Sequence, residues 1–205
     1  VINNLNLSAA VGEPIKMSME WVFQNQSISS ADTLANNISL SSVMPMVYAD
    51  GTYRYDATEG SLTSSVAEPI QSFELEIKNN LVVDEQNRQL GSRVISGRPP
   101  ATRREILLKT TQRFDTTTSF SRMVQNTAGA ASLFFSGTTI SAEFNRSMNI
   151  IMPNVRIKGT DPLVEGADGI LQCEVEFDVI LSGNAATLTS REIGITVRNA
   201  VTAKR

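Results

Sequence analysis

The segment from Leu171 to Leu181 constrains the fold more than any other part of the chain, because its side chains alternate strictly between apolar and polar. One face carries an apolar set and the other an acidic set: Leu171, Cys173, Val175, Phe177, Val179 and Leu181 against Gln172, Glu174, Glu176 and Asp178. A period of two is typical of a strand buried on one side. We therefore predict a β-strand with a core face and an acidic face, paired through a turn-rich loop with the segment that begins at Asn154.

The same period of two recurs along the chain. Between Ile70 and Lys78 an apolar set again alternates with a charged one: Phe73, Leu75 and Ile77 against Glu74, Glu76 and Lys78. Further strands are predicted for residues 1–7, 15–23, 106–114, 133–144, 146–158 and 193–198. Pro153 is expected to mark an edge, a bend or a bulge. In the 15–23 strand, the stripe that includes Met17, Met19 and Trp21 is expected to pack in the core rather than to bind a ligand.

One short helix is expected to flank these strands. Three threonines from Thr116 to Thr118 offer N-cap oxygens, and Gly129 is predicted to stop the helix. The helical spacing i, i+3, i+4 and i+7 is met by Phe120, Met123, Val124 and Thr127. About eight to ten strands, one helix and no strand-helix alternation indicate a mainly β fold. We expect a single domain over residues 1–205, an antiparallel β-sandwich or barrel.

The dipeptide Asp50-Gly51 predicts a tight hairpin between residues 46–48 and 53–55, because Asp-Gly readily adopts the positive φ angles of such turns. Tyr48, Tyr53 and Tyr55 are then expected to pair across the two strands. The alternative is that these tyrosines form a sugar platform, which would make the chain a carbohydrate-binding or adhesion sandwich.

The chain has no histidine and one cysteine, Cys173, which we expect to be a buried, inert thiol. The lack of histidine excludes His-based triads and most zinc sites. The sequence contains no G-x-S-x-G, no S-x-x-K and no phosphate-cradling glycine loop. We therefore expect that the chain is not an enzyme and that it binds no cofactor or metal. An enzymatic function would need a pair of carboxylates in a cleft. The net charge of −3 gives no basic field for nucleic acid, and no apolar run is long enough to span a bilayer.

Residues 86–105 form a long, basic and turn-rich loop between two strands. Its arginines occur without an acidic residue between Gln86 and Glu105: Arg88, Arg93, Arg98, Arg103 and Arg104. Three interpretations of this loop are open. It is an ordinary solvated loop, it binds nucleic-acid phosphates, or it reaches a neighbouring subunit whose surface is acidic. We favour the last interpretation, because arginine binds carboxylates in a bidentate manner.

The acidic strand faces also admit two interpretations. They keep an outer face hydrated, or one sheet continues from subunit to subunit and turns its acidic face toward a common channel. Joined sheets would leave no unpaired edge strand.

The order of these features resembles that of the tail tube proteins, or major tail proteins, of long-tailed bacteriophages. The C-terminal likeness lies in Pro153-Asn154-Val155, Asp161-Pro162 and Glu165-Gly166, followed by the apolar-acidic strand. The segment from Leu5 to Lys16 with Trp21-Val22, then Asn79-Asn80-Leu81, and the closing Ile195 to Asn199 also fit. The resemblance covers nearly the whole chain. Its opening resembles a segment found midway along such proteins, so we expect that an N-terminal segment precedes it.

The resemblance implies a structural virion protein with a β-barrel-like fold and one flanking helix. It implies hexameric rings stacked into a hollow tube, through whose lumen double-stranded genome DNA passes without specific binding. The implied partners are other copies and other tail proteins such as the tape measure, tail tip and terminator. The implied location is the virion tail, assembled in the host bacterial cytoplasm. The nearest alternative is the tube protein of a contractile injection or secretion system.

Alternation and charge supply the candidate site residues. We predict that an acidic lumen is lined by Glu74, Glu76, Glu174, Glu176 and Asp178. We predict contacts between rings at Arg88, Arg93 and Arg98.

Overall fold

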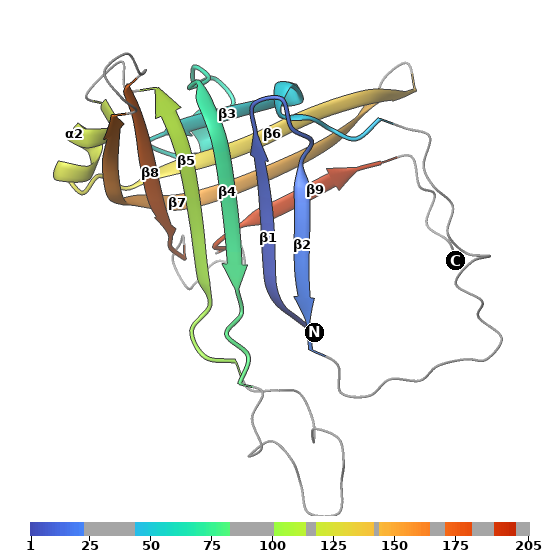
Figure 1. Ribbon diagram of the computed structural model, residues 1–205, viewed down its shortest axis with the longest axis horizontal. Helices are drawn as coiled ribbons and strands as arrows, with labels where there is room; N and C mark the ends of the chain where they lie inside the picture. Colours follow the sequence, from blue (N-terminus) through green and yellow to red (C-terminus); the bar gives the residue numbers. More distant parts are fainter. Residues whose placement is uncertain are drawn as a thin grey trace, which may run out of the picture.

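The computed structural model describes residues 1–22, 44–82, 101–113, 118–141, 144–164, 171–181 and 191–199. Within these ranges the chain forms one antiparallel sheet of nine strands that curls into a half-barrel (Figure 1). The strands are β1 (Ile2–Ala10), β2 (Lys16–Trp21), β3 (Gly51–Asp56), β4 (Ile70–Lys78), β5 (Glu105–Arg113), β6 (Gly129–Ser141), β7 (Phe144–Val164), β8 (Leu171–Val179) and β9 (Gly194–Arg198). Two 3-10 turns, η1 (Tyr48–Asp50) and η2 (Glu59–Ser61), and one helix, α2 (Thr118–Val124), complete the described elements.

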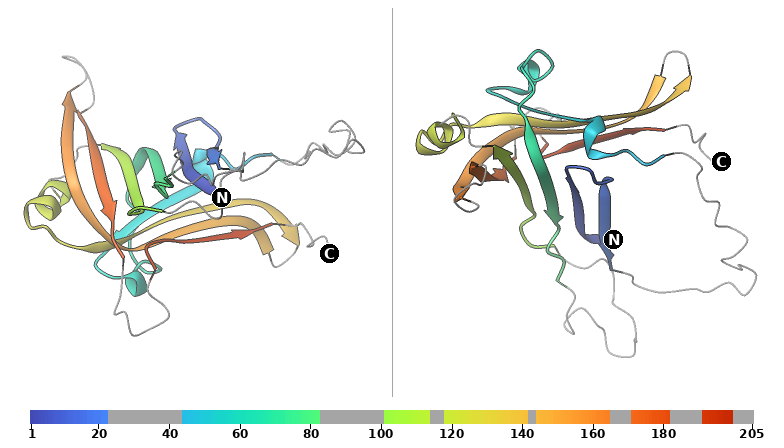
Figure 2. Two further views of the ribbon diagram at one scale, coloured as in Figure 1. Left: turned by 90° about the horizontal axis from the view of Figure 1, so that it is seen from below. Right: turned by 45° about the horizontal axis from the view of Figure 1, so that its top comes forward.

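The curled sheet forms two layers that cross each other (Figures 1 and 2). The first layer has the strand order β2-β1-β4-β5-β8, and the second contains β3, β6, β7 and β9. The long strand β7 connects the layers, because its first part pairs with β6 and β9 and its last part pairs with β8. The β6–β7 register shifts between Met152 and Val155, so Pro153 lies at an irregularity, as predicted.

The predicted alternation is confirmed in β4 and in β8, but Leu181, which was predicted on the apolar face, lies beyond the end of β8 and is 55% exposed. In β8 the side chains of Cys173, Val175 and Phe177 are buried, while Asp178 is exposed. In β4 the buried positions are Phe73 and Leu75. These residues pack against the second layer in one core cluster, whose largest members include Phe135, Leu133, Ile150 and Met152. The mainly β, antiparallel fold class is therefore confirmed.

The predicted hairpin at Asp50-Gly51 is wrong. Tyr48 to Asp50 form η1, and β3 pairs with β6 instead of with residues 46–48. Gly51 has a φ of −94°, so the positive φ that glycine permits is not used. A Cβ at Gly51 would lie 2.5 Å from the Phe135 ring, so close packing is what requires a glycine there.

The helix α2 exists but does not end where the sequence suggested. Asn126, with a φ of 49°, lies just beyond its last turn, and Gly129 is the first residue of β6. Asparagine tolerates the left-handed conformation that helix termini use. The strand predicted for residues 146–158 is also longer than expected, because β7 continues to Val164. Among the described residues, no helix is long and apolar enough to cross a membrane.

Candidate functional surface

The face of the first layer that points away from the core, called here the outer face, holds all five predicted carboxylates. Glu74 on β4 lies opposite Lys109 on β5, and Lys109 lies opposite Glu176 on β8. Glu76 and Asp178 both lie opposite Leu107. Because cross-strand neighbours lie on the same side of a sheet, strands far apart in sequence bring these carboxylates together, with Glu174 opposite Thr111.

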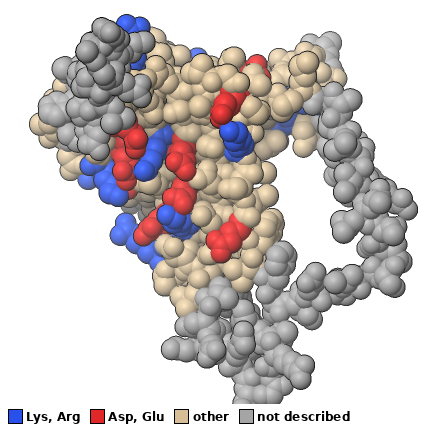
Figure 3. Space-filling view, viewed as in Figure 1, with Lys and Arg blue, Asp and Glu red and all other residues tan. Residues whose placement is uncertain are grey.

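The outer face is less acidic than the carboxylates alone predicted, because lysines alternate with them (Figure 3). Lys158 contacts Glu176 at 3.1 Å, and Lys78 contacts Glu76 at 2.9 Å. Lys109 contacts Glu174 at 3.8 Å. The outer face therefore carries ion pairs between lysines and carboxylates, and not only uncompensated negative charge.

These ion pairs stabilise the charged form of the lysines. A hydrogen bond to Glu176, followed by the charges of Glu176 and Asp178, raises the pKa of Lys158. A hydrogen bond to Glu76 and the charge of that carboxylate raise the pKa of Lys78. Both lysines are therefore protonated at neutral pH.

Strand β1 contributes polar groups that hold two of the carboxylates. The Asn6 side-chain amide donates to Glu74 at 2.7 Å, and the Asn4 amide donates to Glu76 at 3.4 Å. Beside them lies an open polar hollow of about 400 Å³, whose lining includes Ser8, Ser72, Lys109 and Glu174. Within the part of the chain that the structure describes, no group of three or more His, Cys, Asp or Glu residues is arranged to hold a metal ion.

Strand β2 forms one edge of the first layer (Figure 1). Its apolar side chains were predicted to pack in the core, and that prediction is wrong. Met17 is 60% exposed, Met19 41% and Trp21 47%, although they lie on the core side of the layer, where Leu5 and Leu7 are their neighbours. The second layer does not cover this edge, because the strands of the two layers cross.

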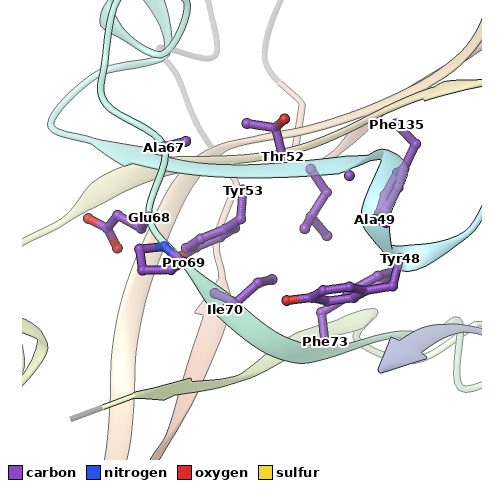
Figure 4. A pocket seen from close by; sticks show the side chains of 12 residues that line it. Tyr48, Ala49, Thr52, Tyr53, Ala67, Glu68, Pro69, Ile70, Phe73 and Phe135 are labelled. Atoms are coloured by element: carbon purple, nitrogen blue, oxygen red, sulfur yellow. The ribbon is translucent and has the colours of Figure 1, made fainter. Parts of the chain in front are cut away.

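The tyrosines do not form an accessible platform. Tyr53 is 3% exposed and Tyr55 6% exposed, and they pair with Leu133 and Ala131 of β6 instead of with each other. Tyr53 and Tyr48 instead line an apolar pocket of about 360 Å³ together with Ile70 and Phe73 (Figure 4). Burial raises the pKa of Tyr53 well above its ordinary value. This burial removes the feature on which a carbohydrate-binding function depended.

Arg122 connects helix α2 to the neighbouring elements. Arg122 makes an ion pair with Glu68 at 2.9 Å, and its guanidinium lies 4.2 Å from the centre of the Tyr55 ring. The remaining prediction, contacts at Arg88, Arg93 and Arg98, concerns residues that lie outside the described ranges.

Sequence reasoning missed two properties of this surface. It placed Lys78 on the same strand face as Glu74 and Glu76 but did not predict that lysines pair with the carboxylates, although Lys78 and Lys109 occupy the same alternating positions as the acids. The exposure of β2 had no such signal, because a period of two looks the same in an edge strand and in a central one.

The described part of the chain is thus an antiparallel half-barrel with a short flanking helix and one polar sheet face. The family model described as phage tail tube protein matches residues 1–179, and the chain belongs to that family. Among solved structures, the SPP1 tail tube, determined by solid-state NMR and cryo-EM, is similar at 14% identity and a TM-score of 0.46. That match covers 65% of this chain and 75% of the other. No curated protein matches the chain. Family membership makes the chain a component of the phage tail that polymerises into a tube together with other tail proteins.

Proposed function

We propose that copies of this chain form hexameric rings that stack into a hollow tube, with the outer face of the first layer turned toward the bore. Double-stranded DNA passes through that bore. The observation that carries the proposal is the gathering of Glu74, Glu76, Glu174, Glu176 and Asp178 on one sheet face that no other described element covers. The opposite side of the same layer packs into the core, so this side is the one left to face a channel.

The ion pairs suit such a channel. DNA binds proteins chiefly when lysine and arginine neutralise its phosphates. Here carboxylates pair with Lys78, Lys109 and Lys158, so these three lysines offer little free positive charge to a passing phosphate. The carboxylates in turn repel phosphates. A DNA duplex that meets no free positive charge in the bore does not bind there and can move through it.

A second part of the proposal concerns ring stacking. Arg88, Arg93 and Arg98 contact acidic groups of the adjacent ring, because a basic segment in a tube of identical subunits meets the subunits' own carboxylates. Replacing these three arginines with serine is expected to shorten tubes while the subunit stays folded. Long tubes of normal stability would contradict this contact.

The test of the bore assignment is the triple substitution Glu174→Lys, Glu176→Lys and Asp178→Lys in the infecting phage. We expect tubes to form but DNA delivery to slow, with delivery recovering as salt rises, because salt weakens lysine–phosphate contacts. The matched control is the triple change to Gln, Gln and Asn, which removes the same carboxylates without adding cations and should slow delivery less. Delivery at the native rate through tubes of the lysine variant would contradict the proposal.

A further inference from the structure

The apolar pocket of about 360 Å³ lies between η1, β3 and the start of β4 (Figure 4). Exposed residues form its mouth, among them Ala49, Ala67 and Pro69. Buried residues form its floor, among them Leu133 and Phe135. An apolar cavity of about 150 Å³ is large enough to bind benzene. The pocket therefore has room for a molecule of two fused rings and is open to solvent on one side.

Aromatic rings form much of the pocket wall. The rings of Phe73 and Phe135 lie with their centres 5.5 Å apart, in a tilted arrangement. Tyr53 from β3 and Tyr48 from η1 complete the aromatic part of the wall (Figure 4). Aromatic rings attract one another in offset and edge-to-face contacts, in addition to the gain from burying their surface. The wall therefore favours an aromatic ligand over an aliphatic one of the same size.

One polar group of this wall is buried without a partner. Tyr53 is 3% exposed, and its hydroxyl makes no hydrogen bond within the described part of the chain. Figure 4 shows its ring extending from β3 toward Pro69, across the pocket. Burial raises the pKa of Tyr53, so the hydroxyl keeps its proton at neutral pH and stays a donor. A buried donor without an acceptor is unfavourable, and a ligand that brings an acceptor removes that cost.

The pocket has no group that would balance the charge of a ligand. Among the described residues that line it, Glu68 is the only charged one. Figure 4 shows the Glu68 side chain turned away from the pocket, and its carboxylate pairs with Arg122 at 2.9 Å. An anion would meet no cation in the pocket, and a cation would find Glu68 already paired. Burying an unpaired charge is costly, so the pocket selects a neutral ligand.

We propose that this pocket binds a neutral aromatic molecule that carries a carbonyl oxygen, and that the Tyr53 hydroxyl donates a hydrogen bond to that oxygen. The ring system of the ligand lies among Phe73, Phe135 and Tyr48. The pocket is on the core side of β4, where Phe73 is buried, whereas Glu74 lies on the outer face. The proposal therefore does not depend on which face of the subunit lines the bore.

Two ligands of the same shape test the hydrogen bond. The aromatic ketone α-tetralone carries the carbonyl oxygen, and tetralin has a methylene group in its place. NMR titration of the native subunit should give a dissociation constant of about 10–500 µM for the ketone. Tyr53→Phe keeps the ring and deletes the hydroxyl. This variant should bind α-tetralone about three- to tenfold more weakly and should bind tetralin as the native subunit does.

Tyr55→Phe is the matched control, because the Tyr55 hydroxyl is also buried without a partner but Tyr55 does not line this pocket. It should leave the affinity for α-tetralone unchanged. Naphthoate, a carboxylate of similar size, should bind at least about tenfold more weakly than the ketone. In the complex, nuclear Overhauser contacts should join the ligand to the rings of Phe73 and Phe135.

Four results would overturn the proposal. They are no binding of α-tetralone to the native subunit, equal effects of Tyr53→Phe on the ketone and on tetralin, a Tyr55→Phe change that weakens ketone binding as much as Tyr53→Phe does, and naphthoate binding as tight as that of the ketone. Binding without contacts to the Phe73 and Phe135 rings would place the ligand elsewhere and would also contradict it.

Discussion

Lys109 on β5 makes its ion pair with Glu174, a diagonal neighbour on β8 at 3.8 Å, and not with Glu176, the residue directly opposite. Glu176 is instead held by Lys158 of β7. Each of these two β8 carboxylates therefore has its own lysine, from the strand on either side. This arrangement spreads opposite charges over the outer face and limits repulsion among carboxylates that share it.

Removal of Lys109 should reveal that repulsion. Lys109→Gln leaves Glu74, Glu174 and Glu176 close together, and we expect a loss of about 0.5–1 kcal/mol in the free energy of unfolding at low salt. Added salt should recover most of the loss, because it screens exposed like charges. The control is Lys16→Gln, which removes an exposed pair with Glu13 near a turn and should change stability less. Equal effects of the two changes in urea titrations would contradict the clustering.

Two adjacent leucines of β5 test which face is the core. Leu108 is fully buried, whereas Leu107 is half-buried on the outer face. Leu108→Ala should cost about 2–5 kcal/mol through lost burial and a residual cavity. Leu107→Ala should cost less than about 1 kcal/mol. Denaturant titrations of both variants measure the free energy of unfolding and test this assignment. A larger loss for Leu107→Ala would show that the Leu107 side of β5 is the core face.

Gly129 is required by close packing against β3. An added Cβ would lie 2.4 Å from the Tyr55 hydroxyl oxygen and 2.7 Å from the Asp56 carbonyl oxygen. Gly129→Ala should therefore destabilise the fold by about 1–3 kcal/mol. Gly60→Ala is the matched control, since an added Cβ there meets nothing within 4 Å. Thermal unfolding measures both changes, and equal melting temperatures would show that the Gly129 site has room.

We predict that the protein loses stability at alkaline pH because the Tyr53 hydroxyl is buried. Burial is the main cause that raises the pKa of Tyr53 well above its ordinary value of 10.0, and the hydroxyl has no hydrogen-bond partner among the described residues. Above pH 10.0 the unfolded chain releases this proton while the folded chain keeps it. Stability contributed by the neutral hydroxyl is thus intact below that pH and is lost as pH rises further.

Tyr53→Phe should remove this part of the alkaline loss. The variant should be at least as stable as the native protein at pH 7, because no hydrogen bond is broken. Melting temperatures of the two proteins from pH 7 to pH 11 test the prediction. A native protein and a variant that lose stability in parallel above pH 10 would contradict it.

The sequence was sufficient to predict the strands in which the alternation of apolar and polar residues follows the alternation of buried and exposed side chains. For Phe73 and Leu75, and for Val175 and Phe177, the alternation predicted the buried positions correctly. It also placed the carboxylates of β4 and β8 on one side of their strands. Their gathering on one sheet depends on β5, which pairs with both β4 and β8, and strand order cannot be read from alternation.

The failures have causes that lie outside the local sequence. Asp50-Gly51 has the composition of a hairpin turn, yet tertiary packing against Phe135 selected an extended glycine. Met17 and Met19 have the pattern of core residues, yet they lie beyond the area that the second layer covers. In both cases the deciding contact involves a residue distant in sequence, which no local pattern contains.

The most direct test of the central claim is a cryo-EM map of the assembled tube at a resolution that shows side chains. We predict rings of six subunits in which Glu74, Glu176 and Asp178 line the bore. The side chains of Phe73 and Val175 should be buried behind them, between the two layers of each subunit. A map in which those carboxylates lie on the outside of the tube, or in which the bore is lined by the second layer, would contradict the account.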